Sequence, residues 1–213
     1  MIRALLFDFD GLLLDTEGPS YRAWAEVYER HGHELPLGTW AAAIGTIDGF
    51  DPVRHLDGLG VTLDEAAQEA RRRRDLDLCD LEELRPGVAE LLEEADRRRL
   101  RTAIVSSSDE GWIARHLDRH DLLDRFAAVV CANGDAARAK PRPTLYLEAL
   151  ERLGVRAEEA VAFEDSPNGA AAAKAAGILC VAVPNEVTSA LDLSAADRVV
   201  RSLEDVDLDE LGI

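Results

Sequence analysis

Two patterns of apolar and polar residues follow each other along the chain, and the change between them divides the sequence. In segments 1–15 and 84–213, short apolar runs alternate with amphipathic stretches, whereas segment 16–83 has only the three- and four-residue spacing of helices. Strands that are apolar throughout and are separated by helices are typical of a parallel sheet covered on both faces. We therefore predict an α/β fold whose core (1–15 and 84–213) is interrupted by an all-helical insertion (16–83).

Each expected element is bounded by turn residues or by a change of period. The strands are expected over 2–9, 101–105, 127–131, 160–163, 178–183 and 198–200. The core helices are expected over 88–99, 109–120, 144–153 and 168–176, with a further acidic helix at the C-terminus. The insertion is expected to hold helices over 20–31, 36–44, 52–59 and 64–78, with a loop over 45–49.

Composition narrows the class of protein. A content of 47% hydrophobic residues in 213 residues is enough for a real core, and a formal net charge of -18 disfavours nucleic acid or an anionic membrane as the main partner. No apolar run is long enough to span a membrane, and no signal peptide is apparent.

The three cysteines, Cys79, Cys131 and Cys180, are far apart and fit neither a disulfide framework nor a zinc site. We expect a cytoplasmic protein that binds no membrane and no nucleic acid.

Polar side chains follow the first four strands of the core at the points where these strands end. Because ligands bind at the carboxyl ends of parallel strands, we expect four carboxylates, two hydroxyls and one ammonium group to meet at one edge. These residues are Asp8, Asp10, Ser106, Ser107, Lys140, Glu164 and Asp165. Carboxylates in this number suit a hard divalent cation such as Mg²⁺, and the hydroxyls and the ammonium group suit phosphate oxygens.

This set of side chains is sufficient for phosphoryl transfer. Asp8 can attack phosphorus and form an aspartyl-phosphate, while Lys140 stabilises charge on the transferring group. Asp10, two residues further on, points the same way and can protonate the leaving alkoxide and then activate water. The sequence therefore predicts a Mg²⁺-assisted phosphoryl-transfer site.

Four motifs in the same order resemble those of the haloacid dehalogenase-like (HAD) phosphohydrolases, in the helical-cap subgroup that includes β-phosphoglucomutase and phosphoglycolate phosphatase-type enzymes. The matching segments are Asp8-Phe9-Asp10-Gly11 with its extension Asp15-Thr16-Glu17, Ile104-Val105-Ser106-Ser107, Lys140-Pro141-x-Pro143, and Phe163-Glu164-Asp165-Ser166-x-Asn168-Gly169. The resemblance implies a Rossmann-like three-layer αβα core, a helical cap domain and a phosphatase.

The resemblance also implies roles for individual residues. Asp8 would be the nucleophile, and Asp10 the acid and base. Mg²⁺ would be held by Asp8, the backbone carbonyl of Asp10 and Asp165, with Glu164 assisting. The predicted phosphate ligands are Ser106, Ser107, Lys140 and Gly11, and Thr46 in the loop of the insertion is predicted to touch the substrate.

The predicted activity is hydrolysis of a small phosphorylated metabolite, such as a sugar phosphate, by a monomeric enzyme. A phosphosugar mutase is the first alternative, but the β-phosphoglucomutase branch carries a His where this chain has Ser20, and an Arg in the cap loop where segment 45–49 has none. A phosphometabolite-binding regulator is the second alternative, although a protein that only binds has no need of a nucleophile.

Other polar and aromatic residues have simpler interpretations. Ser108 is expected to cap the helix that follows it, and Arg71–Arg74 to form a solvated helix face. Trp24 and Trp40 are expected in the core of the insertion.

Overall fold

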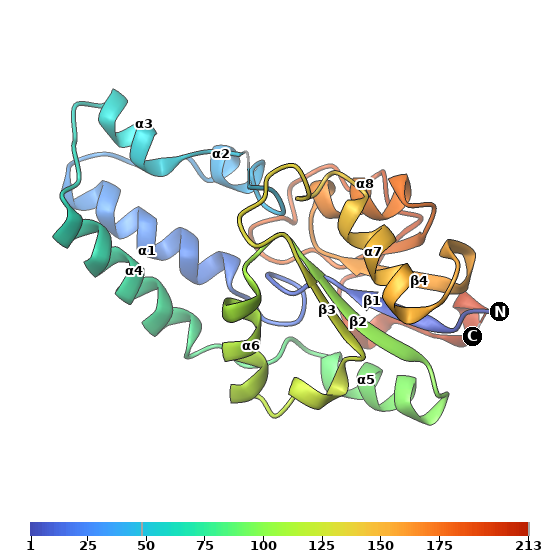
Figure 1. The fold of residues 1–213 in the computed structure, drawn as a ribbon. Coiled ribbons are helices and arrows are strands. Elements are labelled where there is room, and N and C mark those ends of the chain that lie inside the picture. Colours follow the sequence, from blue (N-terminus) through green and yellow to red (C-terminus); the bar gives the residue numbers. More distant parts are fainter. Residues whose placement is uncertain (48, 213) are drawn as a thin grey trace.

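The computed structural model describes residues 1–47 and 49–212, so that Asp48, within the loop expected over 45–49, and Ile213 lie outside the described residues. A six-stranded parallel sheet with the order β3-β2-β1-β4-β5-β6 forms its centre (Figure 1). The strands are β1 (Ala4–Phe7), β2 (Arg101–Ser106), β3 (Ala128–Cys131), β4 (Ala160–Glu164), β5 (Leu179–Ala182) and β6 (Arg198–Val199). The predicted α/β class with a parallel sheet is confirmed.

Strand β1 lies in the middle of the sheet, and its register explains which residues it brings together. Phe7 is level with Ile104 of β2 on one side and with Phe163 of β4 on the other. All three strands run in the same direction, so the residues that follow them emerge at one edge of the sheet.

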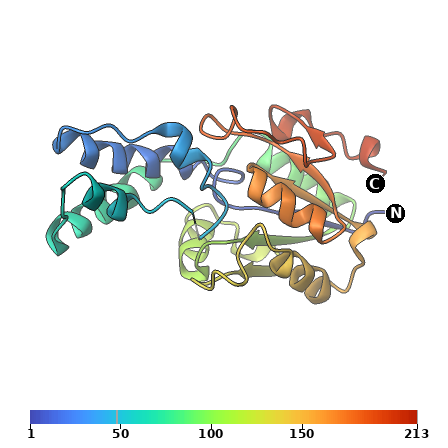
Figure 2. The ribbon, with the colours of Figure 1, turned by 90° about the horizontal axis from the view of Figure 1, so that it is seen from above.

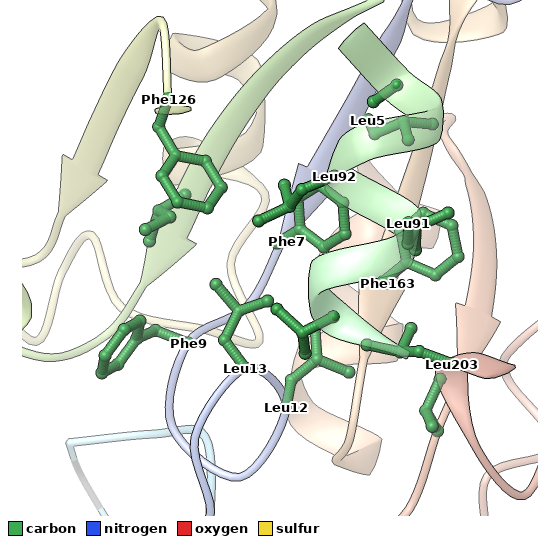
Figure 3. Packing of buried hydrophobic residues seen from close by; sticks show 14 of the residues in the cluster. Leu5, Phe7, Phe9, Leu12, Leu13, Leu91, Leu92, Phe126, Phe163 and Leu203 are labelled. Carbon is green, nitrogen blue, oxygen red and sulfur yellow. The ribbon is translucent and has the colours of Figure 1, made fainter. Parts of the chain in front are cut away.

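Alternate residues of β1 face opposite sides of the sheet. Helices α5 (Val88–Arg97) and α6 (Glu110–Arg119) cover the side of Leu5 and Phe7, where Phe7 stacks on Phe163 with ring centroids 5.2 Å apart (Figure 3). Since strand side chains alternate with a period of two, both faces of this strand are buried.

The opposite face of the sheet is lined by smaller side chains. Helices α7 (Thr144–Leu153) and α8 (Pro167–Ala175) cover it, and Ala4 and Leu6 of β1 belong to its apolar cluster (Figure 2). The buried face of α8 is made of alanines and a glycine, and side chains of this size leave room for a helix to lie close to the sheet.

The helices of the insertion extend from the carboxyl-terminal edge of the sheet, at the end of the molecule opposite the two termini (Figure 1). They are α1 (Glu17–Arg30), α2 (Leu37–Ala41), α3 (Pro52–Gly58) and α4 (Glu65–Cys79). Their apolar cluster is built around Trp24 and Tyr28, with Trp40 packed against it, as expected from the sequence. Leu14 pairs with Leu84 where the chain leaves and re-enters the core. A domain boundary at these two crossings, at 15/16 and 83/84, stays a prediction.

The prediction of an acidic helix at the C-terminus is wrong. Two short 3₁₀ turns, Leu203–Asp205 and Asp209–Leu211, take its place. The side chains of Ser202 and Asp207 accept from the backbone N–H groups of Glu204 and Asp209, and such local hydrogen bonds compete with those of a continuous helix. Among the described residues, no helix is both long and apolar enough to cross a membrane.

Candidate active site

Asp8 lies directly after β1 and is held from two directions. Its backbone N–H donates to the carbonyl of Phe163 at 3.0 Å, and its Oδ1 accepts from Lys140 Nζ at 2.7 Å. Burial raises the pKa of Asp8, Lys140 opposes this effect, and the charge of Asp10 adds to it. The Asp8 carboxylate is therefore an anion that depends on its neighbours for stabilisation.

Lys140 joins two carboxylates in the interior. Its side chain is 1% exposed, and Nζ lies 2.7 Å from both Asp8 Oδ1 and Glu164 Oε1. Burial lowers the pKa of Lys140, but the two carboxylates more than offset this effect and raise the pKa above its usual value. The backbone N–H of Lys140 donates to Ser107 Oγ at 3.2 Å, which positions the segment between β3 and α7. Lys140 is thus a permanent cation between Asp8 and Glu164.

Glu164 is the last residue of β4, Asp165 follows it, and both are completely buried. Together with Asp8, each offers a carboxylate oxygen within 4.8 Å of the others. The hydroxyl of Tyr146 donates to Glu164 Oε1, and Asn185 Nδ2 donates to Asp165 Oδ2 at 2.8 Å. Burial, followed by the charge of Asp8, raises the pKa of both Glu164 and Asp165.

Two glycines make room for these carboxylates. A Cβ on Gly169 in α8 would lie 1.7 Å from Glu164 Oε2, and a Cβ on Gly11 would lie 2.3 Å from Asp165 Oδ2. Gly11 also has a φ of +80°, which side chains other than glycine rarely adopt. Both glycines are therefore required for the observed packing of the acidic cluster.

The acidic cluster fits a divalent cation. Three carboxylates and the single ammonium group of Lys140 leave a formal charge of about -2 in a buried place, which a divalent cation would balance. Glu164 Oε2 and Asp165 Oδ1 are buried and have no hydrogen-bond partner among the described residues. Unpaired buried oxygens are costly, and hard cations prefer oxygen ligands. Asp8, Glu164 and Asp165 are therefore the residues that could hold a metal ion.

Asp10 lies outside this cluster, beside the carboxyl end of β2. Its Oδ1 accepts from Thr16 Oγ1 and Trp112 Nε1, both at 2.8 Å. Its Oδ2 accepts from Ser108 Oγ at 2.6 Å and, more weakly, from Ser106 Oγ at 3.4 Å. Asp8 and Asp10 therefore have unequal surroundings, with an ammonium group at the first and neutral donors at the second.

A small cavity of about 170 Å³ lies between the two aspartates and the loop of the insertion. Its walls are formed by Asp8, Asp10, Glu17, Gly45, Thr46, Ile47, Ser106, Ser107 and Ser108. Ser107 Oγ donates to the carbonyl of Gly45 at 2.9 Å, and Asn168 Nδ2 donates to that of Ile44 at 2.7 Å. The loop thus closes over the strand ends and forms one wall of the site.

The comparisons with known proteins agree with this geometry. Residues 2–177 match the haloacid dehalogenase-like hydrolase family. The chain belongs to this family.

Three relatives of this HAD-like hydrolase illustrate the match. The Bacillus subtilis (strain 168) protein called "Putative phosphatase YhcW" is 43% identical, covering 98% of this chain and 95% of that protein. The "Phosphorylated carbohydrates phosphatase" of Thermotoga maritima is 30% identical, covering 83% of this chain and 82% of that protein. The crystal structure of CbbY from Rhodobacter sphaeroides in complex with phosphate is 28% identical with a TM-score of 0.78, covering 100% of both chains. The resemblance seen in the four sequence motifs is confirmed.

Hydrogen bonds within this HAD-like hydrolase bear on three of the sequence predictions. The N–H of Gly11 donates to the carbonyl of Leu14 at 2.8 Å, and the role of Gly11 as a phosphate ligand stays a prediction. The hydroxyl of Ser107 donates to the carbonyl of Gly45, and Ser107 also lines the small cavity, so its role as a phosphate ligand stays a prediction. Ser108 does not cap α6, because Asp109 occupies the N-cap position and the hydroxyl of Ser108 binds Asp10.

A second cavity of about 520 Å³ adjoins Asp10 and lies against α1, α4 and α6. Arg71 of α4 lines it, with its guanidinium 4.7 Å from the centre of the Trp24 ring and 2.8 Å from Asp75. The expectation that the whole run 71–74 is a solvated face is therefore wrong for Arg71, whose side chain is 15% exposed. The aromatic partner of Arg71 is Trp24, which lies 47 residues away in the sequence, so the spacing within the arginine run does not reveal this contact.

Three residues of the site were missed from the sequence, Tyr146, Asn185 and Trp112, and Glu17 was quoted with the first motif but given no role in the site. Asn185 follows β5 and could have been found by the same rule that gave the other strand-end residues. Glu17 lines both cavities, and burial together with Asp10 and Asp8 raises its pKa well above the usual value. Tyr146 and Trp112 lie inside helices, where no local signal separates them from core aromatics.

Proposed function

We propose that this HAD-like hydrolase is a Mg²⁺-dependent phosphomonoester hydrolase of small phosphorylated metabolites, with a sugar phosphate as the first class to test. The observation that carries the proposal is the placement of Asp8, which is paired with a buried lysine, belongs to an acidic cluster that could hold a cation, and lines a cavity together with Asp10. Relatives named as phosphatases, one of them for phosphorylated carbohydrates, support the same activity.

The substrate would lie across the two cavities. The smaller one, of about 170 Å³ beside Asp8 and Ser106, suits a phosphoryl group, and the larger one, of about 520 Å³ beyond Asp10, suits the rest of the molecule. Pockets of this combined size accommodate small ligands. Thr46 lines the smaller cavity, in keeping with its predicted contact with the substrate.

Two chemical steps follow from the residues. In the first step, an Asp8 oxygen forms a bond to phosphorus, the bond from phosphorus to the leaving oxygen breaks, and Asp10 gives that oxygen a proton. In the second step, water bonds to phosphorus as Asp10 takes its proton, and the bond between phosphorus and Asp8 breaks. Lys140 keeps Asp8 in place in both steps and stabilises charge beside it.

In this proposal the metal ion would be held beside Asp8 and would supply positive charge to the site. Asp8 and Asp165 would hold Mg²⁺ together with the backbone carbonyl of Asp10, and Glu164 would assist from its position on Lys140. When bound, the cation supplies the positive charge that lets an anionic phosphate approach an anionic carboxylate. A monomer stays a prediction from the family resemblance, and a cytoplasmic protein without nucleic-acid or membrane partners stays a prediction from composition.

The decisive experiment is release of inorganic phosphate from a panel of sugar phosphates and other monoesters, with MgCl₂ or with EDTA. We expect Mg²⁺-dependent release by the wild type and loss of activity in Asp8→Asn. Asp118→Asn is the matched control, because Asp118 is exposed on α6. Absence of Mg²⁺-dependent release from every monoester at high enzyme concentration would refute the hydrolase.

The same preparations distinguish the alternatives. A mutase would interconvert hexose phosphate isomers and would need a bisphosphate to do so, whereas a regulator would bind a phosphometabolite without turnover. Thermal unfolding reports on the metal without turnover: Mg²⁺ at one hundred times its dissociation constant should stabilise the wild type by about 2.7 kcal/mol, and Asp165→Asn by much less.

A further inference from the structure

Asp10 receives one hydrogen bond that differs in kind from the others. Three of its donors are the hydroxyls of Thr16, Ser106 and Ser108, and the fourth is the indole N–H of Trp112. A hydroxyl can rotate toward another acceptor, whereas the direction of an indole N–H is fixed by its ring, and the indole can only donate. Trp112 is therefore the donor that sets the orientation of the Asp10 carboxylate.

The indole ring is itself held in place. Trp112 lies in the first turn of α6 and meets the ring of His116, one turn later, with centroids 4.3 Å apart and planes at 73°. His116 is completely buried and also packs against Phe9, which stands between Asp8 and Asp10 in the sequence. Trp112 thus connects the loop of the two aspartates to the body of α6.

The two oxygens of Asp10 are left with different tasks. Oδ1 accepts from Trp112 and Thr16, so both of its acceptor positions are occupied by donors at 2.8 Å. Oδ2 lies among hydroxyls of Ser106 and Ser108, which can either donate or accept, and all three residues border the small cavity. Oδ2 is therefore the oxygen placed to exchange a proton with a substrate in that cavity.

We propose that Trp112 is a positioning residue for the acid and base of the reaction, which holds Asp10 Oδ1 so that Oδ2 faces the leaving oxygen. This inference rests on the proposed function, because it assigns a role within the same two steps. General acid catalysis requires the acid within hydrogen-bond reach of the proton's destination, and small misplacements are costly.

The test compares leaving groups. Alkyl phosphates need a proton on the leaving oxygen, whereas 2,4-dinitrophenyl phosphate has a leaving group stable enough to depart without one. In Trp112→Phe we expect kcat for an alkyl phosphate to fall about tenfold with KM almost unchanged. This decrease is smaller than the full contribution of general acid catalysis to the rate. We expect the single-turnover formation of the phosphoenzyme from 2,4-dinitrophenyl phosphate to keep its rate.

Trp40→Phe is the matched control, because it removes the same atoms from an indole whose buried N–H has no partner among the described residues. The control should leave the ratio of alkyl to aryl rates unchanged. Equal rates for wild type and Trp112→Phe on the alkyl substrate, or an equal decrease on both substrates, would overturn the positioning role. If the wild type itself releases no phosphate, the proposed function fails instead.

A measurement without turnover tests the hydrogen bond itself. The indole N–H signal of Trp112 in a ¹H–¹⁵N spectrum, assigned as the one that persists in both Trp24→Phe and Trp40→Phe, should move upfield in Asp10→Ala because the carboxylate acceptor is gone. The signals of Trp24 and Trp40 should stay in place. An unmoved Trp112 signal would overturn the inference even if Trp112→Phe folded poorly.

Discussion

Lys140 Nζ lies 2.7 Å from Asp8 Oδ1 in a place where both side chains are at most 5% exposed. A buried ion pair is stable only while both partners are present, because either charge alone would keep its full cost of desolvation. This pair is therefore both a structural and a chemical requirement of the site.

Lys140→Met should strongly destabilise the protein. At pH 8 without divalent cations we expect the free energy of unfolding to fall by about 3–5 kcal/mol, since Asp8 and Glu164 lose the ammonium group between them. Phosphate release should fall by at least about a hundredfold, because the charge beside the transferring group is lost. Urea denaturation and a phosphate-release assay measure the two effects.

The other lysine of the chain provides the control. Lys174 is about one-third exposed and pairs with Asp197, so Lys174→Met should change the free energy of unfolding by less than about 1 kcal/mol. Similar losses in the two variants would contradict the importance assigned to Lys140.

Gly169→Ala should damage the site through a single methyl group. The new Cβ would lie 1.7 Å from Glu164 Oε2, so the carboxylate would have to leave its place beside Lys140. Overpacking of this kind costs about 1–3 kcal/mol, and we expect the stabilisation by Mg²⁺ to decrease as well. Chemical denaturation with and without MgCl₂ measures both.

Gly111→Ala is the matched control within α6. A Cβ there meets nothing within 4 Å, and alanine in a helix is more stable than glycine by about 0.5–1 kcal/mol. Opposite signs for the two substitutions are expected. A stabilised Gly169→Ala with an unchanged response to Mg²⁺ would show that the Glu164 carboxylate does not need its observed position.

The sequence predicts those parts of the structure that depend on patterns of neighbouring residues, such as the strands and the residues at their ends. Strands β1, β2 and β4 are short apolar runs, and the polar residues after them had to meet once the strands were parallel. Asp8 and Asp165 could therefore be placed without coordinates.

Contacts between distant elements could not be predicted in this way. Tyr146 reaches Glu164 from α7, and Trp112 reaches Asp10 from α6, because helix positions depend on how the core packs. The role of Ser108 was misjudged for a similar reason: a serine before a helix is normally a cap, and only the three-dimensional structure brings Asp10 within 2.6 Å of it.

His116 should make the stability of the protein depend on pH. It is completely buried, and its two ring nitrogens have no hydrogen-bond partner among the described residues. Burial lowers the pKa of His116 below 6.5. The positive charges of Arg115 and Arg119 lower this pKa further, whereas the negative charges of Asp10 and Asp80 raise it by less than the total decrease. The folded protein therefore holds a neutral imidazole at pH values where the unfolded chain binds a proton.

The sign of the effect follows from this difference in bound protons. The contribution of neutral His116 is fully present above pH 6.5 and is lost as the pH falls from there toward the lowered pKa, by at most about 1.4 kcal/mol for each pH unit. His116→Leu removes the titrating group and the unpaired nitrogens, so its stability relative to the wild type should be greater at pH 5 than at pH 8. Urea denaturation at the two pH values measures this difference, with His31→Leu at an exposed position as control. A difference that is the same at both pH values would mean that His116 gains a proton as easily in the folded protein as in the unfolded chain, and the packing of Trp112 against a neutral ring would then have to be reconsidered.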